Sequence, residues 1–235
     1  MTDSDYAIDS DGDTGSGGFF AWIRELALIV VVAFVIFTLL RVFIVQVFWI
    51  PSASMRDTLV ENDRIAVSRI AAHTGNIERG DVVVFDDQLD WLPSNLSTGD
   101  SFANAVGRFV GFLSGGSDKT LVKRVIGVGG DHVTCCTAEG KVAVNGVPVD
   151  EPYIADGQLP SDISFDITVP QGTLWVMGDN RGNSADSRYH MGSGETPYVP
   201  EDAVVGTVSA VIWPTSHWKV GLNRRDVFAG IPDAQ

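Results

Sequence analysis

The chain has 235 residues and a formal net charge of −14, from 16 basic and 30 acidic side chains. Its length suits one membrane segment followed by a domain of about 180–190 residues, long enough to bury a sizeable core. An acidic chain argues against nucleic acid as a partner, because phosphate backbones bind basic surfaces. The four histidines are scattered and the two cysteines are adjacent. This spacing is not typical of a metal site, so we expect no metal and no other cofactor.

The N-terminal part of the chain changes abruptly in composition. Residues 1–18 carry five aspartates and hardly any apolar side chain, which is typical of a disordered tail. Residues 19–45 are the predicted membrane anchor. Within them, 26–40 are uncharged and almost wholly apolar, and the apolar run continues past Arg41, which gives the roughly 20 residues that a spanning helix needs. The aromatic residues that suit the two interfacial belts are Trp22, Phe48 and Trp49.

Basic residues around this anchor do not define its orientation. Arg24 precedes the apolar run, whereas Arg41, Arg56 and Arg64 lie at or beyond its far end. The positive-inside rule, taken alone, therefore favours an N-terminus outside the cytoplasm or gives no preference.

Residues 46–235 are predicted to form one β-rich domain. Short apolar or alternating runs of strand length recur along it. Lys141–Gly146 is typical of one hairpin arm that ends in an Asn-Gly turn. These features predict a mainly β, antiparallel fold of coiled or barrel-like sheets. The other predicted strands are Arg64–Ser68, Val82–Phe85, Leu121–Ile126, Thr173–Met177 and Val204–Trp213.

Residues 86–119 interrupt the β pattern as an insertion. Asp100 and Ser101 could cap an amphipathic helix. Such a helix would either pack on the sheet or lie in the membrane interface beside the active site. Its polar face carries one base, Arg108, which weakens the second interpretation, but both stay open. The apolar residues that would share one face are Phe102, Val106, Phe109, Val110 and Leu113.

Cys135 and Cys136 are the only cysteines. They are either two small strand residues that face opposite ways or the two halves of a vicinal disulfide. The second is possible if the domain faces an oxidising compartment.

Ser54 is the first candidate for chemistry, because it lies just beyond the anchor in the stretch Ile50–Leu59. A serine hydroxyl is a weak nucleophile and needs a base. Lys123, in an apolar strand-like run, could be that base if burial removes its charge. Free lysine has a pKa near 10.4, so about one part in a thousand is neutral at pH 7. Desolvation can lower the pKa by several units. The two residues together predict a membrane-anchored serine peptidase with a Ser/Lys dyad.

Four segments, in order, resemble the sequence boxes of type I signal peptidases. They are Ile50–Leu59, Arg79–Phe85, Lys123–Asp131 and Gly178–Arg188, and the similarity extends from about Leu26 to about Pro214. The resemblance implies a membrane-bound serine endopeptidase that removes signal peptides from exported preproteins through an acyl-enzyme. It also implies a single-pass protein of the cell membrane, with its N-terminus in the cytoplasm and residues 46–235 outside. Its partners would be signal-peptide-bearing preproteins and the lipid bilayer.

The same resemblance implies roles for individual residues. Ser54 would be the nucleophile and Lys123 the general base. The Ser54 N–H and the Ser52 hydroxyl would form the oxyanion hole, and Ser184 would hydrogen-bond Lys123. Met55 would touch the substrate or the bilayer. A polar lattice that supports the loop carrying Ser184 would consist of Asp179, Arg181, Asp186 and Arg188; their alternative interpretation is a turn with surface charges.

Two residues depart from the family pattern. Asp57 and Gly129 each stand where the family commonly has proline. Because Asp57 follows the nucleophile so closely, a non-catalytic, membrane-tethered β-domain that binds exported proteins stays an alternative. Other classes fit less well. Ser216–Lys219 is a literal S-x-x-K but lacks the S-D-N and K-T-G partners of penicillin-recognising enzymes, and self-cleaving repressors carry a DNA-binding domain where this chain has an anchor.

Overall fold

The computed structural model describes residues 16–92, 119–192 and 194–233, and the chain divides into two compact units, residues 1–42 and 43–235. The N-terminal unit contains helix α1, Ser16–Phe43. Its segment Ala21–Thr38 is long and apolar enough to cross a membrane. The helix begins inside the predicted tail, which we placed at 1–18. It also ends before the predicted anchor does, because Val45 already pairs with Ser68 in a sheet.

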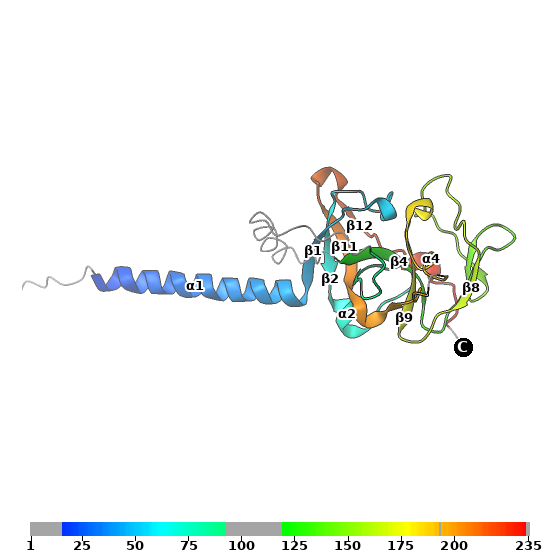
Figure 1. Ribbon diagram of the computed structural model, residues 1–235. Coiled ribbons are helices and arrows are strands. Elements are labelled where there is room, and N and C mark those ends of the chain that lie inside the picture. Colours follow the sequence, from blue (N-terminus) through cyan, green and yellow to red (C-terminus); the bar gives the residue numbers. More distant parts are fainter. Residues whose placement is uncertain (1–15, 93–118, 193, 234–235) are drawn as a thin grey trace, which may run out of the picture. The chain divides into compact units, whose positions relative to one another are not determined.

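The second unit is built on an antiparallel sheet that contains eight of the strands in the described part of the chain (Figure 1). Its order is β1-β2-β11-β3-β4-β9-β10, and β12 pairs with β11. The strands are β1 (Val45–Trp49), β2 (Arg64–Ser68), β3 (Val82–Asp86), β4 (Thr120–Val128), β9 (Thr173–Met177), β10 (Val199–Pro200), β11 (Val204–Trp213) and β12 (Lys219–Val220).

A smaller antiparallel sheet has the order β7-β6-β5-β8. Its strands are β5 (His132–Cys135), β6 (Val142–Val144), β7 (Val147–Pro148) and β8 (Phe165–Thr168). The predicted Asn-Gly turn joins β6 to β7, with φ of 51° at Asn145 and 80° at Gly146. Both residues therefore adopt the positive φ that a two-residue hairpin of this kind requires. At the end of β5, Cys135 is buried and Cys136 exposed, and a disulfide joins them.

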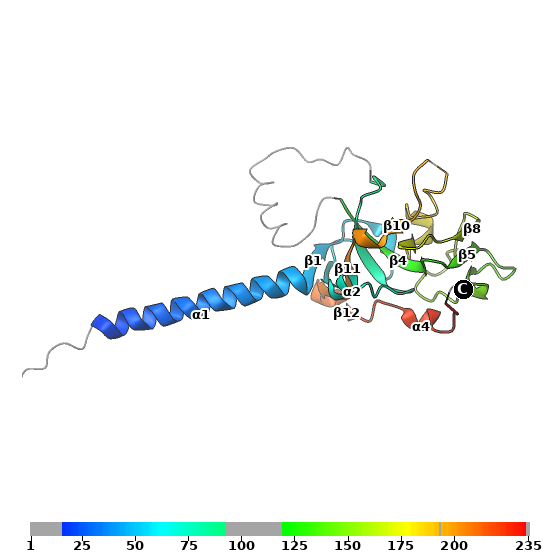
Figure 2. The same cartoon turned by 90° about the horizontal axis from the view of Figure 1, so that it is seen from below.

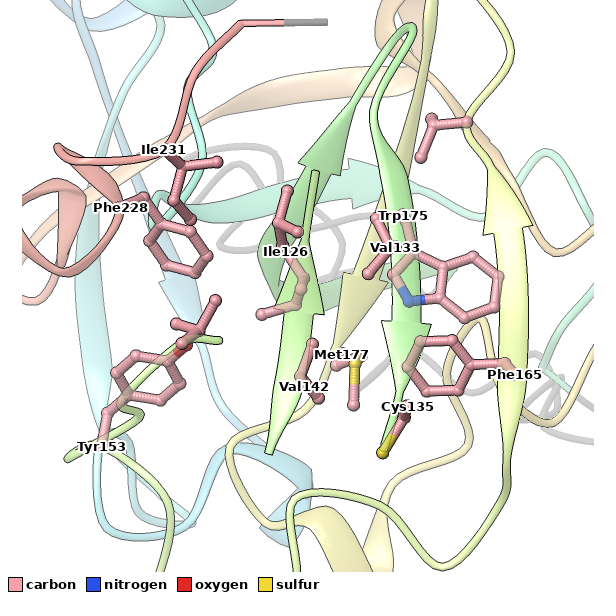
Figure 3. Close-up of a cluster of buried hydrophobic side chains, with 13 residues drawn as sticks. Ile126, Val133, Cys135, Val142, Tyr153, Phe165, Trp175, Met177, Phe228 and Ile231 are labelled. Atoms are coloured by element: carbon pink, nitrogen blue, oxygen red, sulfur yellow. The ribbon is translucent and has the colours of Figure 1, made fainter. Parts of the chain in front are cut away.

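A shared apolar core joins the two sheets (Figure 3). Ile126 and Trp175 enter it from the large sheet, and Val133 and Phe165 enter from the small one. The rings of Phe165 and Trp175 are 5.2 Å apart. Phe228 from helix α4 (Arg225–Phe228) completes the cluster. The small sheet is therefore packed firmly against the strands that carry the candidate site.

The C-terminal segment runs along one side of this unit from β12 to α4 (Figure 2). The Arg225 side chain donates two hydrogen bonds to the buried carboxylate of Asp81, at 2.6 and 2.7 Å. Arg79 pairs in the same bidentate way with buried Asp131, and it also donates to the Ile231 carbonyl. These contacts fix the chain's last described residues to the sheet. The remaining short helical turns are η1 (Ala53–Met55), α2 (Ile70–Thr74), η3 (Arg181–Asn183), η4 (Glu201–Ala203) and η5 (Thr215–His217).

All the strands predicted from the sequence are present, and the mainly β, antiparallel fold is confirmed. One assignment to the membrane interface was wrong. Phe48 is only 4% exposed and packs in a core with Ile50 and Met55, because β1 belongs to the sheet. Trp22 and Trp49 are exposed, as expected. The predicted helix near 100–113 lies outside the described residues.

Candidate active site

The turn that carries Ser54 is held from both sides. Ser54 lies in η1, and the side chain of Ser52 caps this turn by accepting the Ser54 N–H at 3.2 Å. Asn180, in the loop that follows β9, binds the turn through two hydrogen bonds. Its backbone N–H donates to the Ser54 carbonyl at 3.1 Å, and its side chain donates to the Ala53 carbonyl at 2.9 Å. The nucleophile candidate is therefore placed by backbone contacts that leave its hydroxyl available.

Lys123 reaches this hydroxyl from strand β4. Its backbone is held in the sheet by β3, where it lies opposite Val83. Its Nζ lies 2.8 Å from the Ser54 Oγ and 3.1 Å from the carbonyl oxygen of Val122. The residue is 2% exposed, and Ser54 is 8% exposed. The structure thus brings together the two residues that the sequence predicted to form a dyad.

Burial changes the acidity of this lysine. Desolvation lowers the pKa of Lys123 from 10.5 to about 8, although the negative charges of Asp186 and Asp179 oppose the shift. Desolvation acts in this direction because only the protonated amine loses hydration on burial. With a pKa near 8, about a tenth of the lysine is neutral at pH 7, compared with about one part in a thousand for free lysine. A base is therefore available near neutral pH.

Arg124, the next residue on β4, forms a buried hub that the sequence analysis missed. Its guanidinium binds both carboxylate oxygens of Asp179, at 2.8 and 2.6 Å, and neither side chain is exposed. Asp179 also accepts the hydroxyl of Thr58 at 2.5 Å. Arg124 further donates to the carbonyls of Gly80 and Leu222. The hub ties β4 to the end of the nucleophile turn and to the loop after β9.

The loop after β9 contains the predicted polar lattice, but two of its four members pair with residues outside the loop. Asp186 pairs with Arg188, which donates to both carboxylate oxygens. Asp179 pairs instead with Arg124, and Arg181 pairs with Glu151. The four predicted members, Asp179, Arg181, Asp186 and Arg188, are all buried. The alternative interpretation as surface charges was therefore wrong, because each charge is buried against a partner.

Ser184 lies in this loop but does not make the expected hydrogen bond. Its hydroxyl is buried and has no hydrogen-bond partner among the described residues. The Lys123 amine is directed to Ser54 and Val122 instead. Ser184 is still close to the site, because it lies against Gly178, which also contacts the Ser54 carbonyl. A buried hydroxyl without a hydrogen-bond partner lowers the stability of the folded chain. The Ser184 oxygen is therefore free to accept a hydrogen bond from a group that moves within reach.

The two departures from the family pattern, Asp57 and Gly129, both lie where the local backbone restricts which residue fits. Asp57 has a φ of 80°, which proline cannot adopt because its ring holds φ near −65°. At Gly129, a Cβ would lie 3.0 Å from the Cα of Gln171, so a side chain there would require its neighbour to shift by a few tenths of an ångström. The backbone at Asp57 therefore excludes proline, and the backbone at Gly129 leaves little room for a side chain.

The described residues contain no group of three His, Cys, Asp or Glu side chains arranged to hold a metal ion. The sequence could have indicated two of the missed site residues, Arg124 and Asn180, because each stands inside a quoted box next to a predicted residue. Thr58 likewise stands inside the stretch Ile50–Leu59, but nothing local to Thr58 or Glu151 indicates the partner that each one has. Their roles depend on contacts with segments 30 and 121 residues away.

The sequence of the chain matches one known protein family. The family described as signal peptidase, peptidase S26, matches residues 23–213. A probable signal peptidase I of Mycobacterium leprae (strain TN) is 37% identical over 226 residues, which cover 83% of this chain and 77% of the relative. Signal peptidase I of Mycobacterium tuberculosis (strain CDC 1551 / Oshkosh) is 35% identical, with 84% of this chain and 75% of the relative covered.

Among solved structures, a signal peptidase I from Enterococcus faecalis V583 is 22% identical, with a TM-score of 0.37, and the match covers 57% of this chain and 97% of that chain. The family match and the mycobacterial relatives each span most of the sequence. On these two findings, the chain belongs to the signal peptidase family, peptidase S26, and is a serine endopeptidase of the signal peptidase I type.

Proposed function

We propose that the chain removes signal peptides from exported preproteins with Ser54 as nucleophile and Lys123 as general base. The observation that carries this proposal is the 2.8 Å contact between the Ser54 Oγ and the Nζ of a buried lysine. A neutral amine at this distance accepts the hydroxyl proton as the oxygen attacks the scissile carbonyl. The same contact favours catalysis over the alternative of a β-domain that only binds exported proteins.

The reaction proceeds in two halves. Ser54 attacks the peptide carbonyl, and its proton moves to Lys123. The tetrahedral intermediate collapses, the C–N bond breaks, and Lys123 returns the proton to the leaving amine of the mature protein. The signal peptide remains as an ester on Ser54. Lys123 then deprotonates a water molecule, which hydrolyses the ester and restores the serine.

An oxyanion hole is provided by Ser54 and Ser52. The Ser54 N–H and the Ser52 hydroxyl are adjacent, because the hydroxyl oxygen accepts that N–H at 3.2 Å. When a substrate carbonyl arrives, its oxygen replaces the Ser52 oxygen as acceptor, and the hydroxyl turns to donate as well. Donors of this kind act on charge that develops in the transition state.

Ser184 acts on Lys123 during this cycle. Its buried hydroxyl has no partner in the described residues. Once Lys123 gains a proton and releases Ser54, Ser184 accepts a hydrogen bond from the ammonium group. The residues of the polar lattice, Asp179, Arg181, Asp186 and Arg188, support the loop that holds Ser184 and form no bonds with the substrate.

A preprotein binds in extended form along β4. Strand β9 pairs with β4 only from Arg124 onward. Leu121–Lys123 therefore has β3 on one side, and no described strand pairs with its other edge. An added strand gains main-chain hydrogen bonds there and passes Ser54. Val122, which is only partly buried, packs on the apolar core there and suits small substrate side chains.

The enzyme works at the membrane. One residue separates the end of helix α1 from the start of β1. On the catalytic unit, Trp49, Trp213 and Trp218 are 57%, 56% and 72% exposed. Trp49 and Trp213 lie opposite the same residue, Arg64, on the strand between them, so their side chains share one face. Clustered exposed aromatics are typical of a membrane interface. The N-terminus lies in the cytoplasm, the catalytic unit lies outside, and nucleic acid is not a partner.

The test uses the purified full-length chain in proteoliposomes with a signal-peptide-bearing preprotein. We expect a shortened product whose new N-terminus, read by mass spectrometry, follows the signal peptide. The Ser54→Ala variant should fold normally and yield no product. Equal cleavage by the purified Ser54→Ala variant would refute the assignment of the nucleophile, and no cleavage by the wild type with several preproteins would refute the function. External protease added to intact cells should digest the catalytic unit if the proposed orientation is right.

A further inference from the structure

The nucleophile loop, residues 50–63, is closed at its base by two backbone hydrogen bonds. The Ile50 N–H donates to the Asp63 carbonyl at 2.9 Å, and the Asn62 N–H donates to the Ile50 carbonyl at 2.8 Å. Ser52 and Ser54 follow Ile50 within four residues. The position of both therefore depends on how firmly this base is held.

The Asp63 side chain is buried in the base of the loop, with 2% of it exposed. Its Oδ2 accepts the backbone N–H of Val60 at 2.8 Å. Its Oδ1 lies 2.8 Å from the Nδ1 of His217. An ionised carboxylate only accepts hydrogen bonds, so the imidazole donates. Within the described residues, His217 is the one side chain that donates to Asp63. Its loss would leave a buried carboxylate oxygen unsatisfied, which is costly.

His217 comes from a distant part of the chain. It lies in η5, between β11 and β12, 154 residues beyond Asp63. Strand β12, two residues further on, makes a second contact with the nucleophile loop, because the Nζ of Lys219 donates to the Asp57 carbonyl at 3.4 Å. Asp57 is the loop residue with a positive φ next to Thr58, which binds Asp179. Both donors lie beyond residue 213, where the family match ends.

We propose that segment 215–219 holds the nucleophile loop in its reactive geometry, with His217 as a positioning residue that acts through Asp63. Lys219 is a second support near the middle of the loop, at Asp57. This inference rests on the proposed function, because it assigns a role in the same cleavage reaction. His217 bonds to Asp63 and, in the described structure, to neither Ser54 nor Lys123. It therefore affects the reaction by fixing where Ser52 and Ser54 lie.

This role predicts a specific kinetic effect. In His217→Ala, the Asp63 carboxylate turns toward water and the base of the loop loosens. Small misplacements of a reacting group can lower rates by about 100-fold, so we expect kcat to fall at least about tenfold. KM should change less than about threefold, because the substrate pairs with β4 and that strand is unaffected. His217→Asn retains an N–H donor near the position of Nδ1 and should restore kcat to within about threefold of wild type.

The experiment uses the full-length chain in proteoliposomes and one preprotein. We would measure kcat, KM and the thermal midpoint for the wild type, His217→Ala and His217→Asn. The matched control is His73→Ala, which removes an exposed histidine in α2, outside the nucleophile loop. A double-mutant cycle adds Asp63→Asn alone and combined with His217→Ala. If His217 acts through Asp63, the second substitution should cost little once the first is present.

Each outcome decides the inference. A kcat for His217→Ala within twofold of wild type would overturn it. So would a fall in kcat that only follows the folded fraction, a failure of His217→Asn to restore activity, or additive effects in the cycle. If instead the wild type itself does not cleave the preprotein, the proposed function fails and not the positioning role.

Discussion

Gly178 and Ser54 approach each other so closely that a Cβ at position 178 would lie 2.5 Å from the Ser54 carbonyl oxygen. The same Cβ would collide with the side chain of Ser184. A glycine at this point therefore lets the loop after β9 close against the nucleophile turn. It also leaves Asn180, two residues later, able to donate to the Ser54 carbonyl.

We predict that Gly178→Ala separates these elements and inactivates the enzyme. Either Ser54 or Ser184 must move by a large fraction of an ångström, and displacement of a catalytic group on this scale costs about 100-fold in rate. The measurement is kcat on a preprotein, with circular dichroism to confirm folding. Gly182→Ala is the matched control, since a Cβ there meets nothing within 4 Å. Equal activity of the two variants would contradict the close-contact interpretation.

Lys123→Arg separates positive charge from basicity. Arginine preserves the charge and most of the length, but it does not deprotonate in proteins. If Lys123 is the general base, the folded variant should lose about 100- to 10,000-fold in activity. Cleavage within about tenfold of wild type would show that Lys123 supplies only a charge. Lys141→Arg, on an exposed lysine paired with Asp150, is the control.

The pH dependence of cleavage should report the lowered pKa of Lys123. The base works only when it is deprotonated, so kcat/KM should rise with pH and level off above a midpoint near 8. An unperturbed lysine would place this midpoint near 10.4. A profile over pH 6–10 distinguishes the two. A midpoint above about 10 would mean that burial does not tune this lysine.

The same pKa shift predicts a cost in stability. Because the folded chain lowers the pKa of Lys123 from 10.5 to about 8, the protonated amine is disfavoured by about 3 kcal/mol in the folded state. The free energy of unfolding should therefore rise as the pH increases from about 8 to about 10.5. Lys123→Met, which buries no charge, should unfold at a higher temperature than wild type at pH 7. A lower midpoint for this variant would show that the amine's hydrogen bonds outweigh its desolvation.

The backbone at Asp57 gives a fifth prediction. Its φ of 80° excludes proline, so Asp57→Pro, which recreates the family pattern, should lower both kcat and the thermal midpoint. Asp57→Gly should be tolerated, because glycine adopts positive φ without strain. Thermal unfolding and kcat of the two variants provide the comparison. A fully active Asp57→Pro enzyme would show that the loop adopts another conformation without loss of function.

Much of the fold could be read from the sequence, because local patterns carry it. The apolar run of α1 and the strand-length runs of β2, β3, β4, β9 and β11 were each predicted near their observed positions. Strand β1 was not. Its sequence, Val45–Trp49, continues the apolar character of the anchor, and only pairing with β2 shows that Phe48 belongs to a domain core.

The sequence by itself determined which residue types the site needs: a serine just beyond the anchor, an apolar-flanked lysine and a loop rich in paired charges. Tertiary structure alone decided their partners. The 2.8 Å contact joins residues 69 positions apart, and Asp179 pairs with Arg124 and not with a charge of its own loop. Ser184 is buried against Gly178 without a hydrogen bond to the lysine. The physical reason is that a hydrogen bond or ion pair forms or is lost when the distance between its atoms changes by a few tenths of an ångström. Those distances are set by strand register and backbone closure far along the chain, and no local pattern records them.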